Sequence, residues 1–395
     1  MTPAERILGK ALAASPMKSA DWSSIQAGLR DRAFFSATVD DARRLAVMRE
    51  AVAKVAAGEL DESQARLAIR EALAKTGYQR PDDVKEGSIR DLYSRRRLDL
   101  VIQTNVAEAR GYVRYLEGTS EGALAAFPCQ EFLRVQRRKV ERTTWRTRWE
   151  RAGGRIYADR MIALKTDPVW TNLSAFGHPW PPFDFNSGMG VRDVGRREAI
   201  RYGVIPADAP PPKPPPTPNF NENLAERLPE GRERETDLFL RDAFGAQVSI
   251  GGNNMVRWNA NLLRDMFAGE GPESAVLGQG RFNPSMLGKI GDEEARQRVS
   301  RLGLTVTSDW MKTHGAKHAA PKGVANLPLS AGDYELIPSL WRSPDTATVQ
   351  EKGRLGRLEL TLDTLDGNRL VLGVNLANAT PTTFYKTTAR APSPA

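Results

Sequence analysis

Two histidines in the last quarter of the chain have a spacing that suits acid–base chemistry. His314 and His318 lie four residues apart, so they share a face if this segment is helical, and Lys317 lies beside them. A site for acid–base chemistry needs a base that takes a proton, an acid that returns one and cations that stabilise the negative charge that develops. Histidine suits the proton transfers because it titrates near neutral pH. The other groups for this chemistry would come from Arg357, Thr383, Tyr385 and Lys386.

A second reading of these residues needs no chemistry. Two exposed histidines can precede a loop, and threonine and tyrosine are good strand formers. The residues after 210 carry 22 Lys+Arg against 21 Asp+Glu, so they offer no strong electrostatic attraction for nucleic acid. The sequence therefore leaves it open whether this part of the chain is an enzyme.

The basic excess lies in the first half, where 35 Lys+Arg oppose 27 Asp+Glu up to residue 210. Much of it is one run, which consists of Arg134, Arg137, Arg138, Lys139, Arg142, Arg146 and Arg148. Such a run can be a solvated helix face, a contact with an acidic protein or a contact with nucleic-acid phosphates.

The stretch from Pro168 to Arg197 combines prolines, glycines and aromatic rings, which predicts irregular backbone with a large apolar surface. It is either packed onto its own domain or presented to a partner protein. In the second case, the contact residues would be Trp170, Phe176, Trp180, Phe183, Phe185 and Met189.

Composition limits the other possibilities. One cysteine, Cys129, excludes an internal disulfide, and three histidines argue against a zinc enzyme. No metal or other cofactor is expected. The sequence shows no signal peptide and no apolar run that could span a bilayer, so we expect a protein made in the cytoplasm with no membrane partner.

The pattern of apolar residues predicts three helices early in the chain, over about 40–57, 61–77 and 88–117, of which the second has Asp61 as its N-cap. Residues 119–160 continue with broken helical patterns. Trp22, Phe34 and Phe35 suggest an arm that docks somewhere, and the sequence does not say on what.

A proline-rich segment within 206–222 marks the best domain boundary, because polyproline is extended and has no core of its own. We expect a mostly α domain over 1–205 that includes the irregular aromatic segment, this linker, and an α+β domain over 223–395 with a small antiparallel sheet. In the second domain, residues 284–302 look helical. Asp366-Gly367 predicts a hairpin turn between the last alternating strands.

Two stretches of the first half resemble the minor head proteins of tailed phages that are similar to protein F of phage Mu. They are PPFDFNSGMGVRDVGRREAIRYGVIP (residues 181–206), which follows LKTDPVW, and the helical DLVIQTNVAEARG (99–111). Many relatives carry a histidine and a Cys-Arg-Cys motif, whereas residues 159–167 here contain neither, so no metal-binding role is carried over. The resemblance implies a structural role in head assembly near the portal, with portal or major capsid proteins as partners, in the prohead or virion.

The layout of residues 300–390 resembles small nuclease modules of phage head proteins, in the group of barnase, EndoU, colicin and RelE-like ribonucleases. The likeness rests on the order of VTSDWMKTHGAKHA, GDYELIPSLWRSPDTATV, two strands and TPTTFYKTT. It implies an alternative function, a metal-independent ribonuclease carried by a head protein, in which the residues named above would supply the base for the 2′-OH proton, the acid for the leaving oxygen and the cations for the phosphorane. A second alternative, based on the basic run, is a DNA-binding packaging accessory.

Overall fold

A 24-residue helix, α6 (Arg95–Gly118), begins where the sequence supplies a cap, because the Ser94 side chain accepts a hydrogen bond from the backbone N–H of Arg97. The preceding helices α4 (Ala42–Ala57) and α5 (Glu62–Lys75) lie within the ranges predicted for the first two helices. Asp61 caps α5 in the expected capping box with Gln64. In this computed structural model, these helices are the main elements before residue 120.

The structure describes residues 1–137 and 143–216. It also describes 224–228, 230–231, 233–244, 248–250, 254–258, 262–268, 272–277, 288, 290, 293–294, 296–297, 304–318, 327–342, 344–350, 356–364, 366–376 and 378–388. Most of the helix expected over 284–302 lies outside these residues. Residues 209–216, within the expected linker, form neither helix nor strand.

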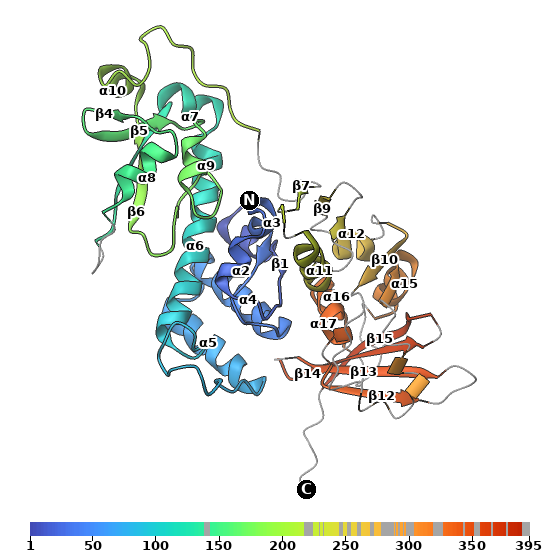
Figure 1. Cartoon of the computed structure of the whole chain (residues 1–395). Coiled ribbons are helices and arrows are strands. Elements are labelled where there is room, and N and C mark those ends of the chain that lie inside the picture. The colour runs from blue at the N-terminus through green and yellow to red at the C-terminus, as the bar shows by residue number, and fades with distance from the viewer. Residues whose placement is uncertain are drawn as a thin grey trace. The chain divides into compact units, whose positions relative to one another are not determined.

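The chain divides into two compact units. The first comprises Met1–Lys10 and Val47–Phe220, and the second comprises Ala11–Ala46 and Asn221–Ala395. The sequence boundaries left residues 11–46 with the helical part, whereas their contacts join them to the second unit. Figure 1 shows the elements of both units.

The first unit contains a four-stranded antiparallel sheet in the order β4-β5-β3-β6. Its strands are β3 (Cys129–Arg134), β4 (Ile156–Tyr157), β5 (Arg160–Leu164) and β6 (Met189–Val194). The sequence patterns did not predict this sheet in a domain expected to be mostly α. The other helices of the unit are α1 (Pro3–Leu8), α7 (Glu121–Ala126), α8 (Trp145–Arg151), α9 (Val169–Leu173) and α10 (Arg196–Arg201).

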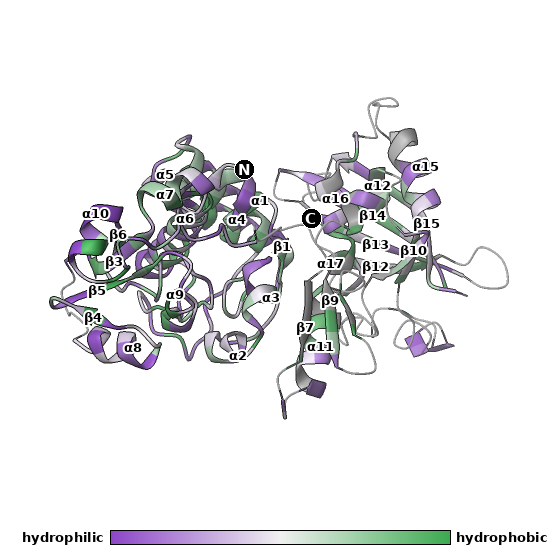
Figure 2. Cartoon of the chain, turned by 90° about the horizontal axis from the view of Figure 1, so that it is seen from above, coloured by the Kyte–Doolittle hydropathy of each residue, from purple (hydrophilic) through white to green (hydrophobic). Residues whose placement is uncertain are grey.

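The second unit begins with an arm formed by residues 11–46. The arm contains β1 (Ala11–Leu12), α2 (Ser19–Ser23), α3 (Ala27–Asp31), β2 (Ala33–Phe34) and the first residues of α4. It shares a hydrophobic cluster with α11 (Glu233–Phe244) and with the sheet of β7 (Leu224–Arg227), β9 (Met255–Trp258) and β8 (Val248–Ile250). Trp22 stacks on Phe35 with ring centroids 4.2 Å apart, and its edge meets Phe239. The expected docking of the arm therefore occurs within this unit. Figure 2 shows hydrophobic residues on β9.

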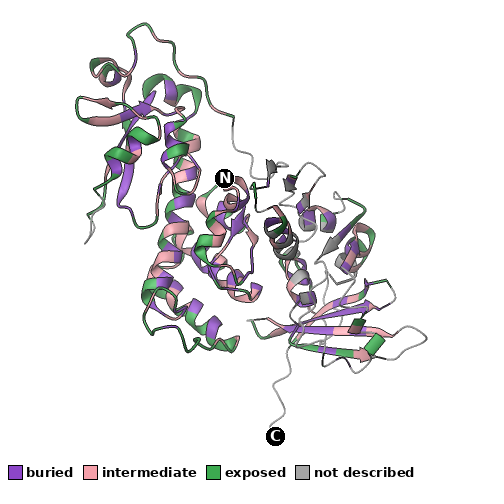
Figure 3. Cartoon of the chain, viewed as in Figure 1, coloured by how far each residue is buried: buried purple, intermediate pink, exposed green. Residues whose placement is uncertain are grey.

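The rest of the second unit is a helix-covered antiparallel sheet in the order β12-β13-β14-β15. The strands are β12 (Thr346–Gln350), β13 (Arg357–Asp363), β14 (Asn368–Asn375) and β15 (Thr380–Thr388). Asp366-Gly367 turns the chain between β13 and β14 as expected, with Gly367 at φ +81°. The other elements are α12 (Leu262–Ala268), β10 (Ser274–Leu277), β11 (Leu304–Thr307), α15 (Ser308–His318), α16 (Ala331–Glu335) and α17 (Ile337–Arg342). Figure 3 shows buried residues along β13 and β14.

Candidate functional site

The aromatic segment of the first unit supplies its core. Trp170 and Phe183 are fully buried and pack with Phe132 and Trp149 of β3 and α8, with centroids 5.1 Å apart for Trp149 and Trp170. The residues of the expected contact surface that are buried are Trp170, Trp180, Phe183 and Met189. For these four residues, the prediction that they contact a partner is wrong. They lie in the interior of the unit, because removing apolar side chains from water is favourable.

Two rings of the same segment remain at the surface. Phe185 is 47% exposed, and Phe176 is half-buried beside it with ring centroids 4.7 Å apart in an edge-to-face arrangement. Phe176 also stacks on His178, which in turn stacks on the buried Trp180. This row of rings links a small exposed apolar patch to the interior of the unit.

A buried ion cluster holds the aromatic segment against α6 and α1. The Glu108 carboxylate of α6 accepts hydrogen bonds from Arg6, from the Lys10 ammonium at 2.9 Å and from the Trp180 indole N–H at 3.1 Å. The Arg6 guanidinium lies 3.7 Å from the ring centroid of Tyr112, one turn further along α6. Burial alone would raise the pKa of Glu108, but Lys10 and Arg6 hold it well below its ordinary value. Glu108 is therefore a buried carboxylate anion.

The two stretches that carry the minor-head-protein resemblance meet at this place. Gly111 of α6 lies so close to Pro181 that a Cβ at residue 111 would be 2.0 Å from the Pro181 carbonyl oxygen. The helix therefore needs glycine there for room rather than for its conformation.

Two cavities have walls formed by both α6 and β6. The first, of about 310 Å³, is lined by residues 100–107 of α6 and by the loop that enters β6. The second, of about 290 Å³, is lined by Gly111 to Thr119, Trp180 and the C-terminal part of β6. Both include Arg114, Pro181 and Val191 in their walls.

The basic run does not form one helix face. Arg134 ends β3, whereas Arg146 and Arg148 belong to α8. Arg146 donates to Asp159 at 2.6 Å, and Arg148 donates to Asp184 at 2.7 Å and stacks over the Trp145 ring. Arg137 is exposed, and Arg138, Lys139 and Arg142 lie outside the described residues. Within the described part of the run, Arg146 and Arg148 are thus paired with carboxylates, and Arg137 is exposed.

The candidate catalytic residues of the second unit lie on opposite faces of the β12–β15 sheet. The strand register places Thr383 opposite Gly373 and Glu359, and Tyr385 opposite Val371 and Thr361, so these residues share one face. Phe384 and Leu360 lie on the other face and belong to the core covered by the helices.

His314 lies on the helical side of the sheet. Its Nδ1 is 3.2 Å from the carbonyl oxygen of Trp310, whose ring lies 6.4 Å from that of Phe384. Lys386 is on the same side, and its ammonium pairs with Asp333 at 3.1 Å and Asp366 at 3.7 Å. The expected grouping of His314 and Lys386 with Arg357, Thr383 and Tyr385 is therefore wrong, because neighbouring strand residues point to opposite faces. His318 and Lys317 continue α15, but their side chains lie outside the described residues.

The face turned away from the helices carries polar groups that the sequence analysis only partly identified. The Arg357 guanidinium donates to the Thr383 hydroxyl at 2.5 Å and lies 3.9 Å from the Glu359 carboxylate. A Cβ at Gly373 would be 2.3 Å from that guanidinium, so the Arg357 side chain fits only because residue 373 has no side chain. Burial and the nearby Glu359 raise the pKa of Tyr385, which keeps the phenol protonated at neutral pH. Glu359 was missed because it is one of several alternating polar residues on its strand.

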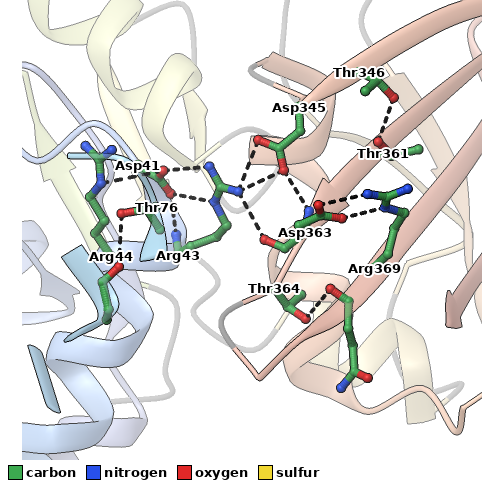
Figure 4. Close-up of polar contacts among 12 residues, drawn as sticks. Asp41, Arg43, Arg44, Thr76, Asp345, Thr346, Thr361, Asp363, Thr364 and Arg369 are labelled. Carbon is green, nitrogen blue, oxygen red and sulfur yellow. Dashed lines mark hydrogen bonds and ion pairs between the residues drawn. The ribbon is translucent and has the colours of Figure 1, made fainter. Parts of the chain in front are cut away.

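A second polar network joins the arm to the edge of the same sheet. Figure 4 shows the Arg43 guanidinium between Asp41 and Asp345, and the Asp345 carboxylate accepts a further bond from the Asp363 backbone N–H at 2.7 Å. Arg43 also donates to the Asp363 carbonyl oxygen at 3.0 Å, and Arg369 pairs with the Asp363 carboxylate. Burial alone would lower the pKa of Arg43. The hydrogen bonds to Asp41 and Asp345 and the charges of these two carboxylates outweigh the burial, so the pKa is raised. This network is an anchor rather than a reactive site.

Comparison of the chain with models of protein families, with curated proteins and with solved structures found no match. Within the described ranges, no group of acidic, histidine or cysteine side chains is arranged to hold a metal ion. The helices that the structure describes include none that is both long and apolar enough to cross a bilayer. Burial raises the pKa of the Cys129 thiol to about 12, so it is a poor nucleophile.

Proposed function

We propose that this chain is a phage minor head protein that acts in head assembly near the portal. The observation that carries the proposal is that the two stretches resembling such proteins, residues 99–111 and 181–206, build one continuous part of the first unit. They meet at Gly111 and Pro181 and line the same two cavities, and the indole of Trp180, which directly precedes the second stretch, donates a hydrogen bond to Glu108 of the first. Two segments that are far apart in the chain, resemble the same family and lie in contact support the proposal more strongly than either segment alone.

A structural role also suits the way the chain is built. Two compact units can engage different components of a particle. Their partners would be the portal and major capsid proteins. Of the six residues expected to contact a partner, Phe185 and Phe176 are the ones accessible for it. Aromatic residues of this kind are typical anchors of protein interfaces.

The test is to search purified proheads and virions for the chain by mass spectrometry and to mix the full chain with purified portal protein. We expect the chain in proheads and a complex with the portal that Phe185→Asp weakens. The matched control is Phe127→Asp, which makes the same change at another exposed phenylalanine that was not expected to contact a partner. Absence from both particles, together with no portal complex, would overturn the assembly role.

A second candidate function, a metal-independent ribonuclease, is favoured by the polar face of the β12–β15 sheet. Arg357 could bind a phosphate and Glu359 could take the 2′-OH proton, while Tyr385 stays protonated and can donate. The expected histidine pair is replaced here by a carboxylate and a phenol on one face, because His314 lies on the helical side.

The enzyme assay uses the full chain with RNA and a chelator. If the candidate is correct, Arg357→Ala and Glu359→Gln abolish cleavage, whereas His314→Ala retains it. Lack of cleavage by the folded chain, or loss of cleavage in His314→Ala alone, would reject this set of residues. The result does not bear on the assembly role, which requires no catalysis.

A further inference from the structure

Strand β6 is the outer strand of its sheet. In the described structure its only strand partner is β3, which it pairs from Met189 to Val194. In an antiparallel pair, every second residue of an edge strand points its N–H and C=O away from the neighbour. Among the residues that the structure describes, the backbone N–H and C=O groups of Gly190 and Val191 make no hydrogen bond other than those to β3.

Consecutive residues of β6 border the two cavities. Met189, Gly190 and Val191 line the first cavity, and Val191, Arg192 and Asp193 line the second. Helix α6 forms the opposite wall along both, from Leu100 to Thr119. We call this pair of cavities the α6–β6 groove. An extended peptide rises about 3.3 Å per residue, so the six residues of β6 match a segment of roughly the same length.

The charges of the groove point to the chemistry of its occupant. Lys165 pairs with Asp193 at 2.8 Å, and Arg192 pairs with Glu131 and Glu198. Arg114, which lines both cavities, is exposed and makes no ion pair or hydrogen bond with any described residue. It is a positive charge at the middle of the groove that its surroundings do not neutralise.

One further group in the wall lacks a partner. Gln130 is 8% exposed, lines the second cavity, and its side chain has no hydrogen-bond partner in the part of the chain that is described. An amide side chain carries both donors and an acceptor. A peptide backbone offers both kinds of group, and so fits Gln130 and the β6 edge together.

We propose that the α6–β6 groove binds an extended acidic peptide segment of a partner protein, which pairs with β6 as an added strand and places a carboxylate on Arg114. Nucleic acid fits less well, because the strand edge requires a backbone with alternating donors and acceptors. The inference goes beyond the assembly role and does not depend on it.

The experiment selects binders of the full chain from a displayed library of random 12-residue peptides and measures the affinity of the best one as a synthetic peptide. We expect selected sequences rich in Asp and Glu, with affinity that falls as salt is added. Methylation of alternate backbone nitrogens on the edge facing β6 should abolish binding, because it removes the hydrogen bonds of the added strand. Hydrogen exchange should show new protection of the amides in residues 189–193.

Two variants of α6 form a matched pair. Arg110 is exposed one turn before Arg114 but lines neither cavity. We expect Arg114→Glu to weaken binding about tenfold and Arg110→Glu to change it less than about twofold. Ala107→Trp, which fills the first cavity from the helix side, should also block binding without changing the charge.

Several outcomes would overturn the proposal. These are a selection that yields no binder or only basic and uncharged peptides, equal effects of the two arginine variants, and protection that maps away from β6. Binding that tolerates backbone methylation on both edges would exclude strand addition as well.

Discussion

Glu108 has its carboxylate in the interior of the first unit, where Arg6, Lys10 and the Trp180 indole surround it. A buried charge is costly unless it is fully paired, and removing it leaves two cations without their partner. Its place was visible in the sequence. Glu108 follows Val101 by seven residues on the apolar stripe of α6, which is an unusual place for a carboxylate, yet its two cations lie about 100 residues earlier in the chain.

We expect Glu108→Gln to lower the free energy of unfolding by about 3–5 kcal/mol, the usual effect of breaking a buried pair. Glu117→Gln, at an exposed position of the same helix, should change it by less than about 0.5 kcal/mol. Urea unfolding followed by tryptophan fluorescence measures both. Equal stability of the two variants would mean that the cluster does not support the fold.

The same cluster predicts a dependence of stability on pH. The pKa of Glu108 is lowered in the folded protein, so its contribution is complete above the unfolded-state pKa of about 4.3 and is lost as the pH falls toward the folded-state value. Wild-type protein should lose stability on acidification from pH 5 to 3 more steeply than Glu108→Gln. Parallel curves for the two proteins would contradict this.

At the scale of elements, strand parity decides which residues work together. The sequence already showed that Thr383 and Tyr385 alternate with Phe384 and Lys386. It did not show which face the helices cover, because that follows from long-range packing. The β4–β5–β3–β6 sheet was missed for a related reason: β3 and its partner β6 are short strands separated by more than 50 residues, so no local pattern specifies their pairing. The cap of α5 and the β13–β14 hairpin were predicted correctly because their signals are local.

Arg43 is the residue that fixes the arm to the sheet edge of the second unit. Arg43→Ala removes the bonds to Asp345 and to the Asp363 carbonyl, so we expect a loss of about 1–3 kcal/mol in stability and faster hydrogen exchange at residues 344–346 and 361–363. Arg49→Ala, whose side chain bonds the Lys10 carbonyl in the first unit, is the comparison. If both variants leave exchange at the sheet edge unchanged, the contact of Arg43 contributes nothing.

At the scale of the whole molecule, the chain order and the folded units do not coincide. The first unit ends at Phe220 and the second resumes at Asn221, while residues 11–46 pack with segments that follow residue 221. Nothing local in the sequence could assign the arm. Its apolar residues predict that it docks, whereas the choice of partner depends on the cluster that it completes.

The arm should therefore be required for folding of the second unit. Ala13, Ile25 and Leu29 share one buried cluster with Leu240, Phe244 and Val256, so residues 221–395 alone would expose that surface to water. We expect this fragment to aggregate or bind a hydrophobic dye, and a single chain in which residues 11–46 are joined to it by a flexible linker to be monomeric and cooperative in thermal unfolding. The joined chain with Leu29→Asp, which places a charge in the cluster, should behave like the bare fragment. If residues 221–395 unfold cooperatively at the same temperature with and without the arm, the arm is a surface attachment and the division into these two units is wrong.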